Sequence, residues 1–572
     1  MKSRLLALGS LAVTFVVAAC AQPAPPAETA HGAHPTTPAA AAPRTKLLGN
    51  LGSHGRPIQT ASVEAQQFFD EGLNLLYGFN HEESFKSFER AAALDPNSPM
   101  PHWGMALALG TNINDVALPD RLKQGYQRLA EAVKRQANGS DVERGLVAAL
   151  SKRYVADASG DQNVREQAYS AAMGELSKKF PDDLDVATLH AESIMNLHPW
   201  KLYKADGTPE PWTADIVAIL EGVIKRNPVH PGANHYYIHA VEASNSPGRA
   251  SRSAQRLETL VPGAGHLVHM PAHIYIRTGE YARSAKANAI AAEVDEKYFR
   301  GGASKGFYAM AYYGHNLQFE SAAAMYAGAF AQARAAAQKT VALADPIADQ
   351  MAMIEPFAAQ ELMVLVRFGR WNDVLTAAAK APAPTRTVQT ALYHFARGAA
   401  LAGTGKAAAA ETELRSLKDI AAKIPKEAMV SPNNHGADVA AVAAADLTGR
   451  IAEANGDLTA AVAGFTAAVA AQDRLGYNEP PDWLLPERER LGAVLLKAKR
   501  ASQAEAVFRE DLVKHVGNPR SLYGLFRSLE AQKKPEATEI RQQFDRAWKD
   551  ADVALDDDLY GVVDGRRQTG GG

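Results

Sequence analysis

Histidine is concentrated in one short segment of this chain. Six of its 17 histidines lie between residues 230 and 273, namely His230, His235, His239, His266, His269 and His273. An even distribution would place about one histidine there. Imidazole is the side chain that proteins use most often to bind metals, so the cluster predicts a transition-metal site.

Two of these histidines have the spacing of helical metal ligands. His235 and His239 are four residues apart, which places their imidazoles on one helix face, one turn apart. Helical zinc-binding pairs have this spacing, although the glutamate of the HExxH motif is missing here. Glu242 lies a further turn along, near the same face, and is the candidate acid or base if the site is catalytic.

A second histidine segment surrounds Pro271. Because proline is favoured at the first position of a helix, we expect a helix to begin there. His266 and His269 would then lie in the preceding turn, and His273 in the first turn of the helix. The 38 residues from His235 to His273 are about one helical repeat, so adjacent layers would carry the two segments on equivalent helices.

The same register extends to His315, which follows His273 by 42 residues. The first helices of such repeats line a concave groove, so we expect a stripe of histidines in that groove. The candidate metal ligands are His235, His239, His266, His269, His273 and His315. Structural hydrogen bonding and binding of a non-metal ligand are alternative roles for the cluster, and structural or surface roles are expected for the isolated His102, His190, His394, His435 and His515.

The ligand types restrict the metal. Neutral imidazoles suit zinc, copper, nickel or iron, and a chain with a single cysteine cannot build a thiolate-rich site. The expected cofactor is therefore a transition-metal ion, zinc or copper. Met270 is a candidate soft axial ligand for copper, with packing in the core as the alternative. Three histidines with an open position would suit a zinc-hydroxide nucleophile or an oxidant-binding centre.

Helices are the elements that must position these residues. Alternating β-branched runs are scarce, and alanine-rich stretches with apolar residues at i, i+3, i+4 and i+7 dominate. A small–small–aromatic–small–proline pattern occurs at Gly72, Ser84, Phe88, Ala91 and Pro96. The same offsets return at Gly449, Ala461, Phe465 and Ala468, and at Gly492, Ala504 and Phe508. Small residues allow two helices to cross closely and the aromatic ring fills the gap beside them. We therefore predict an all-α α-solenoid of antiparallel helix pairs, like that of tetratricopeptide repeats (TPR-like).

The N-terminus predicts a lipid anchor. Lys2 and Arg4 precede an apolar stretch of about fifteen residues, which is too short to span a bilayer. It ends in Val-Ala-Ala-Cys, which resembles a bacterial lipobox with Cys20 as the lipidated residue. Ala21 follows, in a context similar to outer-membrane sorting. We expect a lipoprotein of the cell envelope, attached to the outer membrane and facing the periplasm.

The predicted domains follow from composition. Residues 1–19 are a signal peptide, 20–61 an Ala/Pro-rich tether, 62–345 repeats with the histidine cluster, 346–550 further repeats and 551–572 a solvated tail. The Gly-x-Ser-x-Gly match at 302–306 lacks a preceding strand, so we expect a loop there. With 61 basic and 63 acidic residues, the chain lacks the basic excess of a nucleic-acid-binding protein.

Two motifs resemble those of a known family. His269-Met270-Pro271-x-His273 and His315-Asn316-x-x-Phe319 are similar to the His-Met-Pro-x-His and His-Asn-x-His-Phe segments of a family of bacterial tetratricopeptide-repeat (TPR) proteins. Gln318 stands where the second motif has a histidine. The resemblance extends from about Ser62 to Trp548 and implies the fold rather than an activity.

The leading functional hypothesis is a lipid-anchored TPR-like protein that binds a transition metal through its histidines, for metal handling or for presenting a surface to a protein partner. The second is a metal-dependent hydrolase or oxidoreductase that uses the same cluster. The third is a metal-free scaffold whose histidines are structural.

Overall fold

The computed structural model describes residues 45–301, 306–555 and 562–563. The predicted signal peptide, Cys20, most of the expected tether, nearly all of the 302–306 motif and most of the expected tail lie outside these residues. Within them, no helix is both long enough and apolar enough to cross a membrane.

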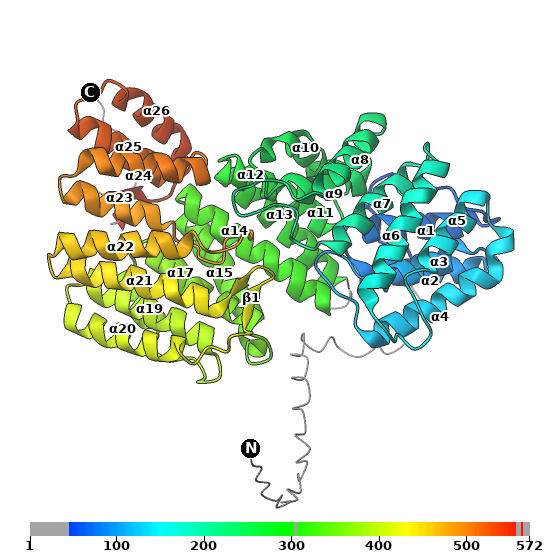
Figure 1. The fold of residues 1–572 in the computed structure, drawn as a ribbon, viewed down its shortest axis with the longest axis horizontal. Helices are drawn as coiled ribbons and strands as arrows, with labels where there is room; N and C mark the ends of the chain where they lie inside the picture. The colour runs from blue at the N-terminus through cyan, green and yellow to red at the C-terminus, as the bar shows by residue number, and fades with distance from the viewer. Residues whose placement is uncertain (1–44, 302–305, 556–561, 564–572) are drawn as a thin grey trace, which may run out of the picture. The chain divides into compact units, whose positions relative to one another are not determined.

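Helices make up nearly all of the regular structure (Figure 1). The first thirteen are α1 (Val63–Tyr77), α2 (His81–Leu94), α3 (Met100–Ala108), α4 (Pro119–Arg135), α5 (Asp141–Leu150), α6 (Gln162–Lys179), α7 (Leu184–Leu197), α8 (Thr213–Arg226), α9 (Pro231–Val241), α10 (Ser251–Leu260), α11 (Gly265–His269), α12 (Pro271–Arg277) and α13 (Tyr281–Arg300). The following thirteen are α14 (Gly314–Ala327), α15 (Phe330–Ala344), α16 (Glu355–Ala358), α17 (Gln360–Arg367), α18 (Trp371–Ala377), α19 (Thr387–Gly403), α20 (Ala407–Ala421), α21 (Gly436–Ala454), α22 (Leu458–Gln472), α23 (Glu487–Lys497), α24 (Ala501–Lys514), α25 (Pro519–Ala531) and α26 (Ala537–Ala547).

Short elements complete the described chain. Two antiparallel pairs of strands are present, β1 (Met429–Ser431) with β2 (Asn434–His435) and β3 (Ala554–Leu555) with β4 (Val562–Val563). Short 3₁₀ turns are η1 (Gln136–Asn138), η2 (Pro247–Ala250), η4 (Asp345–Ile347) and η5 (Ala352–Ile354), and η3 (Ala309–Tyr313) is a π-helical turn.

Consecutive helices pack against each other as antiparallel pairs, and each pair stacks on the following one (Figure 1). The glycines of the predicted pattern explain how closely they approach. A Cβ atom at Gly72 or at Gly104 would lie 2.7 Å from the ring of Phe88, so this ring fills the space between α1 and α3. The ring of Phe508 fills the space between Gly492 and Gly524 in the same way. The chain is thus an all-α, TPR-like α-solenoid, as predicted.

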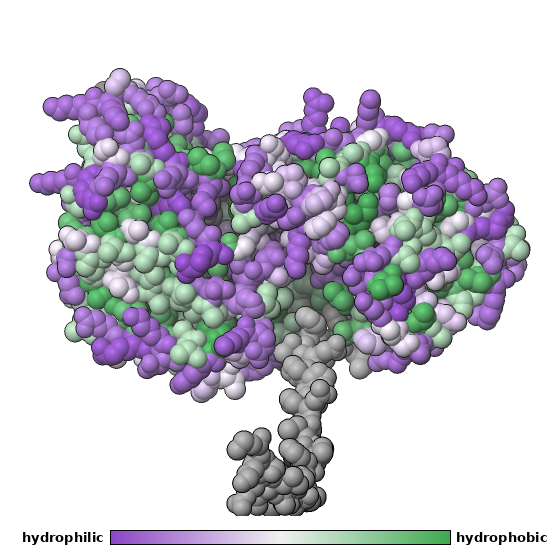
Figure 2. Space-filling model, viewed as in Figure 1, coloured by the Kyte–Doolittle hydropathy of each residue, from purple (hydrophilic) through white to green (hydrophobic). Residues whose placement is uncertain are grey.

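Two large hydrophobic cores support the stack. One draws its buried residues from Leu51 to Tyr312 and the other from Ala285 to Val553, so both include residues between 285 and 312. On the face shown in Figure 2, hydrophobic residues lie in small groups among hydrophilic ones, and the pale green residues around α19–α22 belong to an alanine-rich part of the sequence.

The end of the expected tether differs from the prediction. Residues 45–61 have no helix or strand, but Leu51 and Ile58 are buried and Arg56 forms an ion pair with Asp183 at 2.6 Å. Two apolar side chains and a paired arginine therefore attach this segment to the helices, and the packed body begins before Ser62.

Candidate metal centre

The six predicted metal ligands lie together in two groups of three. His235 and His239 from α9 meet His266 from α11, and we call this group the first tripod. His269 from α11, His273 from α12 and His315 from α14 form the second tripod. In each tripod the three ligand nitrogens lie within 4.8 Å of one another.

In the first tripod the Nδ1 atoms of His235 and His239 donate to protein oxygens. The Nδ1 of His235 donates to the backbone oxygen of Tyr77 at 2.6 Å, and the Nδ1 of His239 donates to Oε1 of Glu242 at 2.8 Å. Both Nε2 atoms are therefore unprotonated in the neutral rings and face inward. The Nε2 of His235 lies 3.1 Å from the Nε2 of His266. The Nε2 of His239 and the Nδ1 of His266 are buried without a hydrogen-bond partner.

The second tripod repeats this arrangement. The Nδ1 of His269 donates to Oδ1 of Asn288 at 2.6 Å, and the Nδ1 of His273 lies 2.5 Å from Oε2 of Glu242. The Nε2 atoms of His269 and His273 then face each other at 2.8 Å. His315 follows the π-helical turn Ala309–Tyr313, and its ring lies 4.8 Å from that of His269. Such turns are frequent at functional sites.

Glu242 connects the two tripods. One of its carboxylate oxygens contacts His239 and the other contacts His273, while the side chain is only 1% exposed. Carboxylates commonly fix the orientation of metal-ligating histidines through the second ring nitrogen. This geometry is the one expected of a positioning carboxylate, and the acid–base role of Glu242 stays a prediction.

The cluster is buried, and it does not line an open groove as expected. Five of the six histidines are at most 5% exposed, and only His315 is half-buried. Phe79, in the turn after α1, packs its ring on His235, His239 and His266 at centroid distances of 4.6–6.2 Å. Its backbone is left-handed, with φ +55°, which is uncommon for a non-glycine residue. Glu479 also contacts the cluster, with Oε2 3.3 Å from the Nδ1 of His273.

Burial controls the protonation of the cluster. Burial lowers the pKa of every candidate ligand except His273. For His235, His266, His269 and His315, neighbouring imidazoles lower the pKa further. Burial also disfavours the charged form of His273, but Glu242 and Glu479 outweigh it and raise its pKa to about 10. Burial raises the pKa of Glu242, and the two histidines beside it reverse this and hold its pKa below the usual value. Neutral imidazoles are the form that binds metal.

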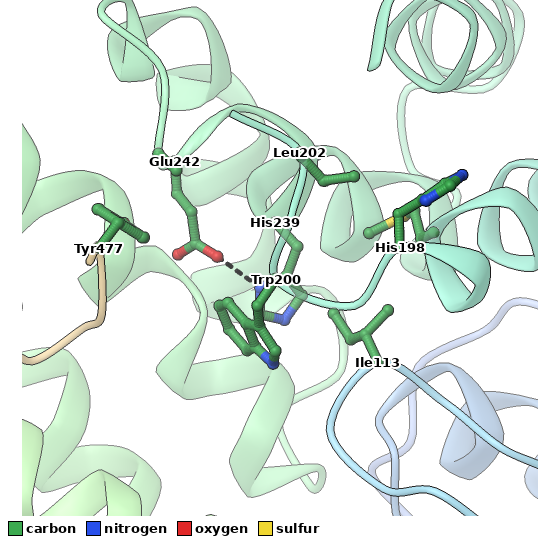
Figure 3. Close-up of a pocket in the computed structure, with 9 residues that line it drawn as sticks. Ile113, His198, Trp200, Leu202, His239, Glu242 and Tyr477 are labelled. Atoms are coloured by element: carbon green, nitrogen blue, oxygen red, sulfur yellow. Dashed lines mark hydrogen bonds and ion pairs between the residues drawn. The ribbon is translucent and has the colours of Figure 1, made fainter. Parts of the chain in front are cut away.

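A narrow pocket reaches the cluster beside His239 and Glu242 (Figure 3). Its walls come from distant parts of the chain, because Ile113 follows α3, Trp200 follows α7 and Tyr477 follows α22. His239 is therefore both a wall of this pocket and a member of the first tripod, and its Nε2 is buried without a hydrogen-bond partner.

Several site residues could not be found from sequence spacing. Asn288 is a polar residue in a helical segment like many others, and Glu479 lies 206 residues after His273 in the loop between α22 and α23. Phe79 carries no pattern that distinguishes it from other core aromatics. None of the three belongs to the histidine periodicity.

His230 belongs to the sequence cluster but lies in another group, with His54 and Asp185. Its Nδ1 accepts a hydrogen bond from the backbone nitrogen of Ala233 at 3.1 Å, so its Nε2 carries the proton and donates to Asp185 at 3.2 Å. Tyr77 also donates to this carboxylate. His230 therefore caps the N-terminus of α9, and its group is held by hydrogen bonds to Asp185.

His394 and His515 lie outside these three groups. His394 bonds Glu413 at 2.7 Å and His515 bonds Asp511 at 2.8 Å, as expected for structural roles. Met270 is fully buried in the hydrophobic core.

Comparisons with known proteins add little. No protein-family model matches the chain, and no curated protein matches it. Among solved structures, the human IFIT1 dimer with m7Gppp-AAAA is 11% identical with a TM-score of 0.31, covering 86% of this chain and 90% of that one. Yeast Tom70 is 10% identical with a TM-score of 0.28, covering 84% and 93%. Likenesses this weak carry no information on function. The fold and the site themselves define the class: a TPR-like helical-repeat protein with a buried histidine cluster.

Proposed function

We propose that this chain is a metal-binding TPR-like protein whose six clustered histidines hold a transition-metal ion. The observation that carries the proposal is the direction of the rings. The Nδ1 atoms of His235, His239, His269 and His273 contact protein oxygens, which leaves their Nε2 atoms for the cluster. The Nε2 of His235 lies beside that of His266, and those of His269 and His273 lie beside each other. A buried polar atom without a partner costs free energy. A bound cation would satisfy these nitrogens together.

The donor set favours zinc or copper. All six candidate ligands are imidazoles, and the nearby carboxylate of Glu242 contacts ring nitrogens on the outer side. Imidazole ligands suit zinc and copper, whereas magnesium, calcium and manganese prefer oxygen. The function of such a site would be metal handling, or stabilisation of a surface that a protein partner recognises.

A metal-dependent enzyme is the second candidate, and one observation favours it. The pocket lined by Ile113, Trp200 and Tyr477 is also lined by His239, so it lies directly beside a candidate ligand of the ion. An open coordination position would then support hydrolytic or oxidative chemistry.

The lipid anchor at Cys20 and the envelope location facing the periplasm are part of the proposal. They rest on the N-terminal sequence alone.

Elemental analysis of the full chain, purified without a polyhistidine tag, tests metal binding. We expect near-stoichiometric zinc or copper in the wild type and its loss in a His235→Ala/His273→Ala variant. His394→Ala is the matched control, because it removes a histidine bonded to a carboxylate outside the cluster. Absence of metal from the wild type, even after incubation with zinc and copper salts, would leave the metal-free scaffold as the function.

A further inference from the structure

We propose that the cluster is a dinuclear centre, in which each tripod holds its own transition-metal ion. This inference rests on the proposed function and adds the number and the assignment of the ions. The first ion would bind His235, His239 and His266, and the second His269, His273 and His315.

The repeat architecture produces the two tripods from one plan. His269 and His273 follow His235 and His239 by 34 residues each, which is the length of one TPR repeat. Each tripod therefore contains one i, i+4 pair, together with a single histidine from the following layer: His266 in the first tripod and His315 in the second. The pair His269/His273 is therefore the equivalent of His235/His239 one repeat further along the chain.

Six imidazoles exceed what one ion of this kind uses. Zinc in proteins is almost always four-coordinate, and catalytic sites commonly have three protein ligands and one open position. Each tripod supplies these three ligands by itself. The shortest contacts between Nε2 atoms lie within the tripods, at 3.1 Å for His235 and His266 and at 2.8 Å for His269 and His273.

The tripods are also adjacent. The ring centroids of His266 and His269 lie 5.5 Å apart, and those of His239 and His273 also lie 5.5 Å apart. Glu242 contacts one ring of each tripod through its two oxygens, so a single carboxylate would orient ligands of both ions.

Charge balance indicates how the open positions would be filled. Two divalent ions bring four positive charges into a buried site, whereas the nearby carboxylates are Glu242 and Glu479. Glu479 is also 3.8 Å from Arg277, which offsets part of its charge. Anionic ligands such as hydroxide are therefore favoured in the open positions, and the pocket lined by His239 and Glu242 lies beside the first tripod.

Native mass spectrometry of the full chain measures the number of ions directly. Chelator-treated wild-type protein is titrated with zinc and, separately, with copper(II). We expect a limit of two ions per chain. With two copper(II) ions bound, we also expect magnetic coupling in the electron paramagnetic resonance spectrum, because the tripods are adjacent.

Variants assign the two ions. His235→Ala/His266→Ala removes two ligands of the first tripod, and His269→Ala/His315→Ala removes two of the second. We expect one ion in each variant, no magnetic coupling, and two ions in the His394→Ala control. Circular dichroism verifies the helical fold, and His→Gln versions replace any Ala variant that fails to fold.

The outcomes separate this inference from the proposed function. A limit of one ion in the wild type would overturn the dinuclear centre and leave metal binding intact. Loss of both ions from either variant would overturn two independent tripods. No ion in the wild type would overturn both proposals.

Discussion

The Nε2 atoms of His269 and His273 lie 2.8 Å apart in the buried cluster. The Nδ1 of His269 donates to Asn288, and the Nδ1 of His273 lies beside Glu242. In two neutral rings bonded this way, both Nε2 atoms carry a lone pair. Two facing lone pairs repel, so this contact requires a cation between them, either a proton on His273 or a metal ion. The two rings are therefore positioned so that a positive charge between their Nε2 atoms is stabilised.

Replacing Glu242 with glutamine should weaken metal binding without removing a ligand. The amide keeps the size of the carboxylate but loses the charge that orients His239 and His273. Loss of such a second-layer partner commonly lowers metal affinity by about 10–100-fold. Competition with a chromophoric chelator measures this change. Glu221→Gln, on the surface, is the control, and an unchanged affinity in Glu242→Gln would contradict the positioning role.

The repeat packing predicts opposite effects for two glycine substitutions. Gly492→Ala would place a Cβ 2.4 Å from the ring of Phe508, which Gly524 confines on the other side, so we expect destabilisation by about 1–3 kcal/mol. Gly222→Ala adds a methyl group on an exposed face of α8 with no atom within 4 Å, and should stabilise by about 0.5–1 kcal/mol. Thermal unfolding measures both. Equal effects would argue against confinement of Phe508.

The repeat pattern could be predicted from the sequence because it is local and periodic. Gly72 and Phe88, like Gly492 and Phe508, are close in the chain, and the structure confirms that each pair is in contact. The i, i+4 pair of His235 and His239 follows from helix geometry alone.

The environment of the histidine cluster could not be predicted from the sequence. Glu479 reaches His273 from a loop 206 residues further along, and its position depends on how many repeats stack between them. The same is true of burial, because Phe79 and Glu479 convert an expected groove into a covered site. No local spacing encodes these contacts.

Asp295 should make stability fall as pH rises. It is buried, and burial raises its pKa to about 7 despite hydrogen bonds from Tyr308 and Asn316. The folded chain therefore holds a proton on Asp295 that the unfolded chain has already released above its ordinary pKa of 3.8. Stability from this group is intact below about pH 4 and is lost progressively up to about pH 7, by as much as about 4 kcal/mol.

Asp295→Asn tests this pH dependence because the amide does not ionise. Thermal unfolding of metal-free wild type and variant, from about pH 5 to about pH 8, gives the difference in stability. We expect the advantage of the wild type over the variant to shrink as pH rises. A constant difference across this range would show that Asp295 stays ionised.

The proposed lipid anchor predicts a change in location for Cys20→Ser. Several acyl chains on one residue bind a membrane firmly, at about 0.8 kcal/mol for each buried CH₂. Wild-type chain should therefore fractionate with membranes, and the variant should not. Mass spectrometry of the N-terminal peptide provides the direct measurement. An unmodified Cys20 in the wild type would contradict the lipobox assignment.

Metal should stabilise the fold because its ligands come from different layers. The second tripod joins α11, α12 and α14, so an ion bound there restrains three helices at once. A ligand that binds only the folded state stabilises it by about 4 kcal/mol at a thousand-fold excess over its Kd. We therefore expect saturating zinc to raise the Tm of chelator-treated wild type and of the His394→Ala control. His269→Ala/His315→Ala, which keeps the first tripod, should show a smaller increase. An equal increase in this variant would mean that the stabilising ion binds elsewhere.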